Sequence, residues 1–398
     1  MGSEVFDIAN GYHGCPWWKR CRRERHCGYL HPETANVFAS GRNRMDIGPV
    51  SELDETAVLA RVRAAAQTRW PGSTITGLTP LPGGVSSLTY RSTLTRPGSP
   101  VSGIVVKVAP PGLAPVRNRD VLRQSRVIAL LDARPEMRMP SILFEDNGSP
   151  PLFVMTLMPG DSYEPLLDVT VEPPMPEVVA RRARTAARML AAMHSFTPEE
   201  LGVDDEPVVT LAEELDRWAR LFNTVDDDIC SGHRELYERL AQSLPATIPE
   251  RLVHGDYRLA NMLFDGSELT AVIDWEIWSV GDPRTDLAWL LMHSDPAHRF
   301  HEQRSVADET AGAAMPSVDE LAATYVGGGG DAALLDSIDW FVAYCLYKTA
   351  STVSALVKRN RRRPDPDPTL VVAGRHLADI VARGTQAMTR FENRSVMR

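Results

Sequence analysis

Cysteine is scarce in this sequence, and no part of it is long and apolar enough to cross a bilayer. The five cysteines among 398 residues are too few for the framework of bridges that holds small secreted domains together. No apolar run approaches the roughly 20 residues of a membrane-spanning helix. No apolar segment follows the basic N-terminal residues, as it would in a secretory signal. We therefore expect a cytoplasmic protein with no membrane partner.

A net positive charge is absent as well. The formal charge of −9 at pH 7 argues against nucleic acid as a main partner, because neutralising phosphates requires a basic surface. The hydrophobic fraction of 43% is ordinary for a globular protein. A chain of 398 residues can bury a large core as two or three domains, or as one large bilobal domain. The sequence does not predict an oligomeric state.

Residues 1–45 differ in character from the rest of the chain. Among several arginines they hold six side chains of zinc-binding type: His13, Cys15, Cys21, His26, Cys27 and His31. Thiolate and imidazole are the usual zinc ligands, but these cysteines lie six residues apart and form no close CxxC pair. A basic arm for an anionic surface is a second interpretation. We favour a third, an unstructured extension that precedes the folded part of the chain.

Residues 46–158 alternate strand-like segments with turn residues, which predicts an antiparallel α+β lobe. Asp54 is expected to cap the first helix, with Val58, Val62 and Ala65 on its inner face. The other expected elements are strands at 74–80, 88–95 and 104–108, a helix at 118–133, and a strand pair at 141–145 and 152–157 joined by the turn Asp146–Ser149.

Residues 159–398 predict a mainly helical second lobe. In the segment 176–195 apolar residues recur at helical spacing, and four arginines are placed outside that stripe: Arg181, Arg182, Arg184 and Arg188. Further helices are expected at 210–223, at 232–243, after Asp282-Pro283, after Ser317 and at 332–358. Short strands are expected to flank the segment 251–276.

The most informative stretch reads HGDYRLAN from His254 to Asn261, followed by IDWE from Ile273 to Glu276. Phosphoryl transfer depends on positioning and on neutralising charge, so it requires oxygen ligands for metal ions and a group that orients the acceptor. Asp256 would orient the acceptor hydroxyl, and Asn261 and Asp274 would hold magnesium. Asp256 alone could instead be a helix cap in a turn, but the joint pattern is hard to obtain by chance.

This pattern closely resembles the aminoglycoside phosphotransferase and choline kinase-like family, whose catalytic loop reads HGDxxxxN and whose metal-binding strand reads IDxE or IDW. The protein-kinase motifs HRDxxxxN and DFG are the same arrangement. Together with GDPRTDLAW at 281–289, the sequence is most similar to kinase-like domains fused to acyl-CoA dehydrogenases. The resemblance covers residues 54–390. It implies a bilobal protein-kinase-like fold and ATP- and magnesium-dependent transfer of the γ-phosphate to a hydroxyl of a small molecule.

The resemblance also assigns nucleotide-binding residues in the first lobe. LPGGVSSLTY at 81–90 matches the family's loop over the ATP phosphates, where glycines let backbone N–H groups approach oxygens. Lys107 would contact the α- and β-phosphates, and backbone groups near Thr156 and Met158 would meet the adenine. Each segment also has an interpretation without a nucleotide. The glycines could form a hairpin turn, Lys107 could point outward from its strand, and the segment near Thr156 could be an ordinary edge strand. The implied ATP-binding residues are Gly83, Gly84, Ser86, Ser87, Lys107, Thr156 and Met158.

Other positions are interpreted through the same family. Gln124 stands where the family has a helix glutamate; it can hydrogen-bond Lys107 but cannot form an ion pair. Arg258 would touch the transferring phosphate as a second catalytic residue, or would form a salt bridge with a nearby carboxylate. His254 is expected to brace the loop, and Asp286 to tie it from the first turn of its helix.

Two alternatives remain for the function. Gln124 is the one feature that favours a catalytically weak pseudokinase, whereas zinc or nucleic-acid binding would rest on residues 1–45. The acidic runs 204–206 and 226–228 could attract a polycationic aminoglycoside but are interpreted as loop and cap residues. The basic C-terminal end counts against a dedicated antibiotic kinase, so a hydroxylated metabolite such as a hydroxyacyl thioester is the preferred acceptor.

Overall fold

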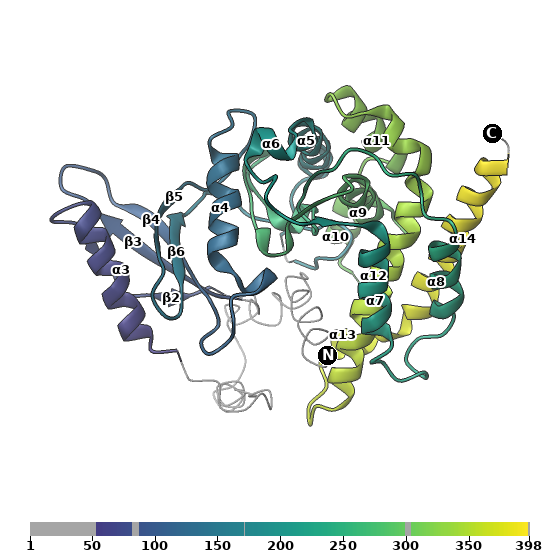
Figure 1. Cartoon of the computed structure of the whole chain (residues 1–398), viewed down its shortest axis with the longest axis horizontal. Coiled ribbons are helices and arrows are strands. Elements are labelled where there is room, and N and C mark those ends of the chain that lie inside the picture. Colours follow the sequence, from purple (N-terminus) through teal and green to yellow (C-terminus); the bar gives the residue numbers. More distant parts are fainter. Residues whose placement is uncertain (1–52, 82–86, 171, 299–303, 397–398) are drawn as a thin grey trace.

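The computed structural model describes residues 53–81, 87–170, 172–298 and 304–396. The chain forms a strand-rich N-terminal lobe and a helical C-terminal lobe that lie side by side (Figure 1). The α+β expectation is therefore confirmed. The unstructured extension predicted for residues 1–45, its zinc-site and basic-arm alternatives, and the predicted site residues Gly83, Gly84 and Ser86 lie outside the described residues.

The N-terminal lobe is built on a six-stranded sheet in the order β1-β3-β4-β6-β5, with β2 paired to β3 and every pairing antiparallel. The strands are β1 (Thr74–Ile75), β2 (Thr79–Pro80), β3 (Leu88–Thr95), β4 (Ser102–Val108), β5 (Ile142–Asp146) and β6 (Leu152–Thr156). The strand expected at 88–95 and the hairpin around 146–149 are confirmed. The single strand expected at 74–80 is divided into two short ones.

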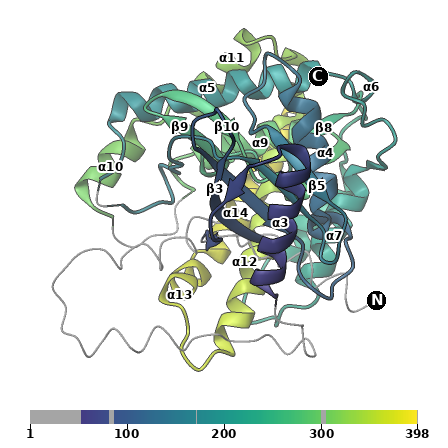
Figure 2. The same ribbon diagram turned by 90° about the vertical axis from the view of Figure 1, so that its left-hand side faces the viewer.

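Two helices flank this sheet and serve different lobes (Figures 1 and 2). α3 (Glu55–Arg69) begins at the predicted cap, since the carboxylate of Asp54 accepts the Ala57 N–H at 3.0 Å. It packs on the outer side of the sheet, but Ala66 rather than the predicted Ala65 is buried. α4 (Val121–Asp132) lies between the sheet and the helical lobe, and its apolar face joins the core of the latter. α4 thus links the two lobes.

The expected start of α4 at residue 118 was too early. Asp120 caps the helix by accepting the N–H groups of Leu122 and Arg123 at 3.1 and 3.0 Å. The residues before it form a separate 3-10 turn, η3 (Arg117–Arg119). A short polar side chain at the cap accepts N–H groups that have no acceptor within the helix, and so sets its first residue.

The C-terminal lobe is helical around the central helix α12. Its helices are α5 (Pro176–Ser195), α6 (Pro198–Leu201), α7 (Leu211–Phe222), α8 (His233–Gln242), α9 (Arg284–Ser294), α10 (Val306–Ala313), α11 (Val318–Gly327), α12 (Ile338–Arg361), α13 (Pro368–Arg375) and α14 (Leu377–Val396). The helix expected at 332–358 is divided into the 3-10 turn η6 (Ala332–Ser337) and α12. In the part of the chain that is described, none of the helices has the length and apolarity needed to cross a membrane.

One predicted outward arginine of α5 is buried. Arg182 is 4% exposed; its guanidinium donates to the Asp161 carboxylate at 2.9 and 3.1 Å and to the Gly266 carbonyl at 2.8 Å. The placement of Arg182 on the solvent side was therefore wrong. A buried guanidinium requires an anionic partner, and the partner here lies 21 residues away in sequence.

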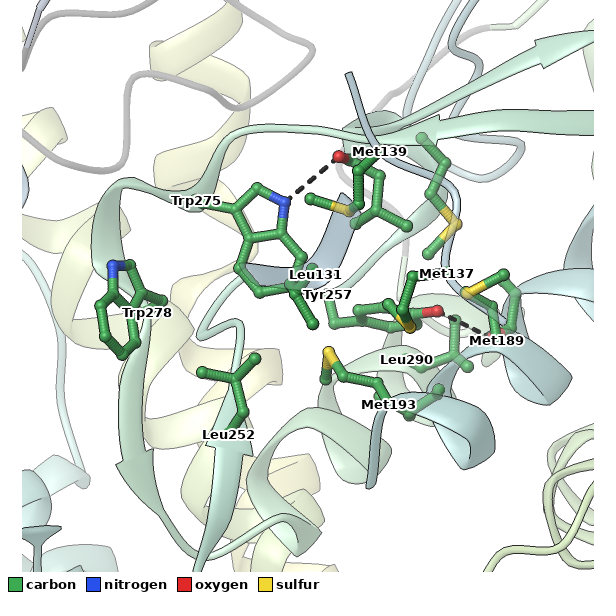
Figure 3. Close-up of a cluster of buried hydrophobic side chains, with 14 of the residues drawn as sticks. Leu131, Met137, Met139, Met189, Met193, Leu252, Tyr257, Trp275, Trp278 and Leu290 are labelled. Atoms are coloured by element: carbon green, nitrogen blue, oxygen red, sulfur yellow. Dashed lines mark hydrogen bonds between the residues drawn. The ribbon is translucent and has the colours of Figure 1, made fainter. Parts of the chain in front are cut away.

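Short strands carry the central loops of the second lobe. They are β7 (Val208–Val209), β8 (Arg251–Val253), β9 (Met262–Asp265), β10 (Glu268–Val272) and β11 (Ser279–Gly281), with the 3-10 turns η4 (Leu259–Asn261) and η5 (Trp275–Ile277). A core of methionine and aromatic side chains lies beneath them, with Met137, Met139, Met189, Met193 and Trp275 among its members (Figure 3). The polar atoms in this core are bonded: Tyr257 donates its hydroxyl to the Ala186 carbonyl at 2.9 Å. This packing supports the loop 254–261 from below.

Candidate active site

The loop that follows β8 makes a turn that only glycine fits. Gly255 has a φ of +84°, and a Cβ at this position would lie 2.8 Å from the carbonyl oxygen of Ile277. Both the left-handed backbone and the close approach exclude a larger side chain. The glycine in HGD is therefore explained by geometry: it lets the chain turn so that Asp256 follows directly on β8.

His254 braces this loop, as predicted. Its Nε2 donates to the carbonyl of Ile273 at 3.0 Å, and its Nδ1 accepts the N–H of Asp256 at 3.2 Å. Burial lowers the pKa of His254, so the ring is neutral and can donate from one nitrogen while accepting at the other. The histidine thereby joins the HGD loop to the segment that carries Asp274.

Asp286 ties the same loop from the first turn of α9, also as predicted. Its two carboxylate oxygens accept the N–H groups of His254 and Gly255 at 2.6 and 2.9 Å. Burial raises the pKa of Asp286 to about 7, although these two backbone hydrogen bonds act in the opposite direction. The carboxyl is a structural acceptor, since both its oxygens are used by the backbone.

Asp256 lies at the centre of the site, and three side chains donate to its carboxylate. Oδ1 accepts Nε of Arg258 at 3.0 Å and the indole N–H of Trp289 at 2.8 Å. Oδ2 accepts the amide of Asn261 at 2.7 Å. The Asp256 side chain is 14% exposed, so the carboxylate is held in place and still reaches the surface. Such fixed orientation is what a group that aligns an acceptor hydroxyl requires.

Arg258 is buried behind Asp256, at 3% exposure. Besides its contact with Asp256, its Nη1 lies 3.9 Å from a carboxylate oxygen of Glu164. Burial raises the pKa of Glu164 to about 8, against the opposing effect of Arg258. The salt-bridge interpretation of Arg258 describes these contacts, and its contact with a transferring phosphate stays a prediction.

The two predicted metal ligands are brought together by a backbone hydrogen bond. The N–H of Ile273 donates to the carbonyl of Asn261 at 2.9 Å, which places Asp274 next to the end of the catalytic loop. Asp274 has a φ of +71° and is one of two non-glycine residues with positive φ among those described. A strained backbone of this kind is found where side-chain placement matters for function.

The donor atoms of these two residues suit magnesium. The amide nitrogen of Asn261 is used by Asp256, whereas its Oδ1 is buried without a hydrogen-bond partner in the described part of the chain. A buried carbonyl oxygen in this state has the capacity to accept a ligand such as a metal ion. One carboxylate and one amide oxygen match the few protein ligands that magnesium takes beside nucleotide phosphates. The residues present therefore fit the metal.

Lys107 reaches this site from the other lobe. It lies on β4, is 8% exposed, and its Nζ is 3.5 Å from Oδ1 of Asp274. The alternative of a lysine pointing to solvent is excluded by this burial. Ser87, the described end of the predicted phosphate loop, is also buried, on the neighbouring strand region. The lysine thus joins the sheet to the metal-ligand segment.

Gln124 does not make the contact that the sequence allowed. Its amide donates to the carbonyl of Asn118 at 3.0 Å, and its Oε1 is buried without a hydrogen-bond partner among the described residues. Lys107 is instead paired with Asp274, on the opposite lobe. The expected role of Gln124 in holding Lys107 finds no support in these contacts.

The predicted adenine contact needs one revision. The amide of Thr156 donates to the carbonyl of Ser141 at 3.0 Å, and the Thr156 hydroxyl accepts the Ser141 N–H at 2.9 Å. This N–H is therefore used within the sheet, because β5 and β6 are paired at this end. An adenine contact would have to come from other backbone groups of the segment, such as those of Met158, and remains a prediction.

Three side chains of the site were not found from the sequence: Glu164, Trp289 and Lys348. Trp289 is the last residue of the GDPRTDLAW motif, so the motif contained a signal for it. Lys348 lies in the middle of the buried helix α12, and a lone lysine in an apolar helix was a usable signal. Glu164 gave no local signal, since it lies 92 residues before Asp256 in a loop.

The acidic runs outside the site are paired with cations. Asp205 and Glu206 bind the guanidiniums of Arg126 and Arg123 at 2.6 and 2.9 Å. In the second run, Asp226, Asp227 and Asp228 pair with Lys358, Arg234 and Arg361. These contacts support the interpretation of both runs as loop residues that join elements.

Known proteins share this sequence pattern and fold. The model of the phosphotransferase enzyme family matches residues 77–321. The probable acyl-CoA dehydrogenase IBR3 of Arabidopsis thaliana is 25% identical over 285 residues, which are 66% of this chain and 34% of that protein. The chain thus spans about a third of the length of this relative. Similarity to acyl-CoA dehydrogenase family proteins confirms the predicted subgroup.

Solved structures confirm the bilobal kinase-like fold. A protein of Ralstonia eutropha, provisionally assigned as an aminoglycoside phosphotransferase, superposes with a TM-score of 0.64 at 18% identity and covers 83% of this chain and 98% of its own. A thermostable mutant of aminoglycoside phosphotransferase APH(4)-Ia, in a ternary complex with ADP and hygromycin B, has a TM-score of 0.52 at 16% identity, with 81% and 98% covered. With the family model matching more than half of its length, the chain belongs to the phosphotransferase enzyme family.

Proposed function

We propose that this protein is an ATP- and magnesium-dependent phosphotransferase that moves the γ-phosphate to a hydroxyl of a small molecule. The observation that carries the proposal is the fixed carboxylate of Asp256, which accepts three side-chain hydrogen bonds and remains partly exposed. It lies beside an amide oxygen and a carboxylate that suit a metal, on Asn261 and Asp274. Membership of the phosphotransferase family supports this reading of the geometry.

In the proposed reaction, Asp256 orients the acceptor hydroxyl and accepts its proton as the bond to phosphorus forms. Arg258 donates to the same carboxylate, so it holds Asp256 in its orientation. Lys107 supplies positive charge from the N-terminal lobe. These groups lie in place before any ligand binds, and positioning of this kind is the main source of catalysis in phosphoryl transfer.

Asn261 and Asp274 would hold the magnesium, with Gly83, Gly84, Ser86 and Ser87 as the proposed phosphate loop. When bound, the metal would neutralise charge on the phosphate oxygens. Asp274 is 3.5 Å from Lys107, so one carboxylate contacts both the metal position and the phosphate-binding lysine. This shared contact explains how the two lobes would present a single triphosphate site.

For the acceptor we propose a hydroxylated metabolite, with hydroxyacyl compounds as the first class to examine. The similarity to acyl-CoA dehydrogenase family proteins supports this class. The acidic runs that could attract a polycationic antibiotic are instead paired with arginine and lysine side chains. An aminoglycoside-type acceptor is the second class, because structural neighbours include an aminoglycoside phosphotransferase.

A coupled nucleotide-release assay tests the proposal. The protein with Mg-ATP is screened against hydroxyacyl thioesters, other hydroxylated metabolites and aminoglycosides, and the phosphorylated product is identified by mass spectrometry. For the acceptor found, Asp256→Asn is expected to lower kcat by about 10²–10⁴-fold with the KM for ATP nearly unchanged. The exposed Asp265 provides a matched control, since Asp265→Asn removes the same charge nearby.

Full rate in Asp256→Asn would contradict the assigned role of this carboxylate. A pseudokinase is the second candidate, favoured by the position of Gln124 away from Lys107. It predicts binding of AMP-PNP in the presence of magnesium, with no turnover of any acceptor and no metal-dependent hydrolysis of ATP. The two functions are thus separated by turnover, whereas nucleotide binding is common to both.

A further inference from the structure

A buried lysine contacts the catalytic loop from the far side. Lys348 lies in the middle of α12 and is 6% exposed, and its Nζ donates to the carbonyl of Gly255 at 2.8 Å. None of its neighbours at 344–352 on α12 is a charged residue that could pair with it; they are aromatic, aliphatic, cysteine and hydroxyl side chains. Burying an ammonium costs free energy, and burial lowers the pKa of Lys348 to about 7. An apolar residue would fill the same space without that cost.

The same ammonium group lies against the tryptophan that holds Asp256. Nζ of Lys348 is 4.3 Å from the ring centroid of Trp289, within the range of a cation–π contact. The indole N–H of Trp289 donates to Oδ1 of Asp256 at 2.8 Å. A cation over the ring face draws electron density from the indole and makes its N–H a stronger donor. Lys348 therefore contacts both the backbone before Asp256 and a side chain bonded to it.

We propose that Lys348 is a positioning residue for Asp256. Its ammonium group fixes the Gly255 carbonyl and the face of Trp289, and these two contacts determine the direction in which the Asp256 carboxylate points. Lys348 touches neither the nucleotide nor the acceptor in this scheme. The inference rests on the proposed function, in which Asp256 aligns the acceptor hydroxyl, and it adds a residue that acts through Asp256.

Other titratable groups share the contacts of Lys348 and have to be considered in any pH dependence. Nζ of Lys348 also lies 5.4 Å from the ring centroid of Trp218. The groups bonded or stacked to the loop, to Trp289 or to Trp218 are Asp256 and Arg258 in the loop, Asp286 and His293 on α9, Glu214 on α7, and Tyr344 on α12. Burial lowers the pKa of His293 to about 3 and raises that of Asp286 to about 7. Asp286 therefore titrates in the same pH range as Lys348. Its contribution is removed by comparing the wild type with a Lys348 variant, because Asp286 is present in both.

The test compares Lys348→Met with the wild type and with Lys358→Met. Methionine keeps a long apolar side chain and removes the charge. Lys358 is a lysine near the C-terminal end of the same helix that pairs with Asp226 at 2.9 Å, so its replacement is a matched control. We expect Lys348→Met to lower kcat by about 10-fold or more with the KM for ATP within about 2-fold. Lys358→Met should leave both values unchanged.

The pH profile separates positioning from a general structural role. Because the ammonium loses its charge as pH rises, the ratio of wild-type to Lys348→Met kcat should fall between pH 6 and pH 9. Asp286 is present in both proteins, so its titration does not change this ratio. An unchanged kcat in Lys348→Met would overturn the proposal. A ratio independent of pH, together with weaker AMP-PNP binding, would equally overturn it, since it would indicate a general loss of packing.

A measurement without turnover keeps the two proposals apart. Deuterium uptake of residues 253–262 is followed by mass spectrometry in the three proteins. Lys348→Met should raise uptake in this loop by several-fold, and Lys358→Met should not. If the wild type turns over no acceptor and hydrolyses no ATP, the proposed function fails, whereas unchanged uptake in Lys348→Met contradicts the inference about Lys348 alone.

Discussion

The two sides of the site are held in different ways. On the catalytic side, the loop around Asp256 is bonded from α9 by Asp286 and Trp289 and from α12 by Lys348, all through buried contacts. On the proposed nucleotide side, Lys107 forms an ion pair with Asp274, and Gln124 is hydrogen-bonded to Asn118. The catalytic side is thus fixed by hydrogen bonds within one lobe, and the nucleotide side by a contact between lobes.

The helix α4 shows how the nucleotide side is held without a lysine–glutamate pair. Arg123 stacks on Trp278 at 3.8 Å and donates to its backbone carbonyl at 3.0 Å, while also pairing with Glu206. Trp278 follows shortly after Asp274 in the chain. The helix is therefore docked on the segment that carries Asp274, the proposed metal ligand, rather than on Lys107. The contrast indicates that the catalytic loop is preformed and that the nucleotide side depends on the docking of α4.

Replacement of Asp286 is the sharpest test of the preformed loop and has the largest expected effect on stability. Asp286→Ala leaves two buried N–H groups without acceptors, which costs about 2–6 kcal/mol at about 1–3 kcal/mol for each. Asp286→Asn retains one acceptor and should cost less. The free energy of unfolding is measured in urea for both variants. Equal stability of Asp286→Ala and the wild type would contradict the claim that buried hydrogen bonds fix the catalytic side.

A smaller effect is expected on the other side, from Arg123. Arg123→Ala removes the cation–π contact, one hydrogen bond to Trp278 and the pair with Glu206, and should lower stability by about 1–3 kcal/mol. Because α4 faces the nucleotide side, AMP-PNP affinity should fall, with kcat for the bound nucleotide little changed. Arg123→Lys keeps the charge but lacks the planar guanidinium, so its stability should lie between those of the wild type and Arg123→Ala. A loss confined to kcat would contradict the separation of the two sides.

The sequence predicted the parts of the molecule whose determinants are local. The boundaries of α5 followed from its apolar stripe, the start of α3 from Asp54, and the roles of His254 and Asp286 from a motif with fixed spacing. For the two helices the residues that matter lie within one element, so periodicity and capping chemistry suffice to place them. His254 and Asp286 act across 19 and 32 positions, and their roles were predicted from the resemblance to a known family instead.

The residues that the sequence did not reveal act across long separations. Lys348 meets Gly255 over 93 positions, and Trp289 meets Asp256 over 33. Arg182 was misplaced because its partner Asp161 lies in a loop whose position depends on the packed fold. Periodicity assigns a side chain to a face of a helix, but it does not reveal which distant group will satisfy a buried charge.

The Mg-dependence of nucleotide binding tests the central claim most directly, that Asn261 and Asp274 hold a metal-bound triphosphate. Isothermal titration of AMP-PNP into the wild type should show affinity that rises by about tenfold or more when magnesium is added, or about 1.4 kcal/mol. Asp274→Asn should lose that increase, and Asp256→Asn should keep it, since Asp256 faces the acceptor. The same increase in Asp274→Asn, or equal wild-type affinity with and without magnesium, would contradict the account.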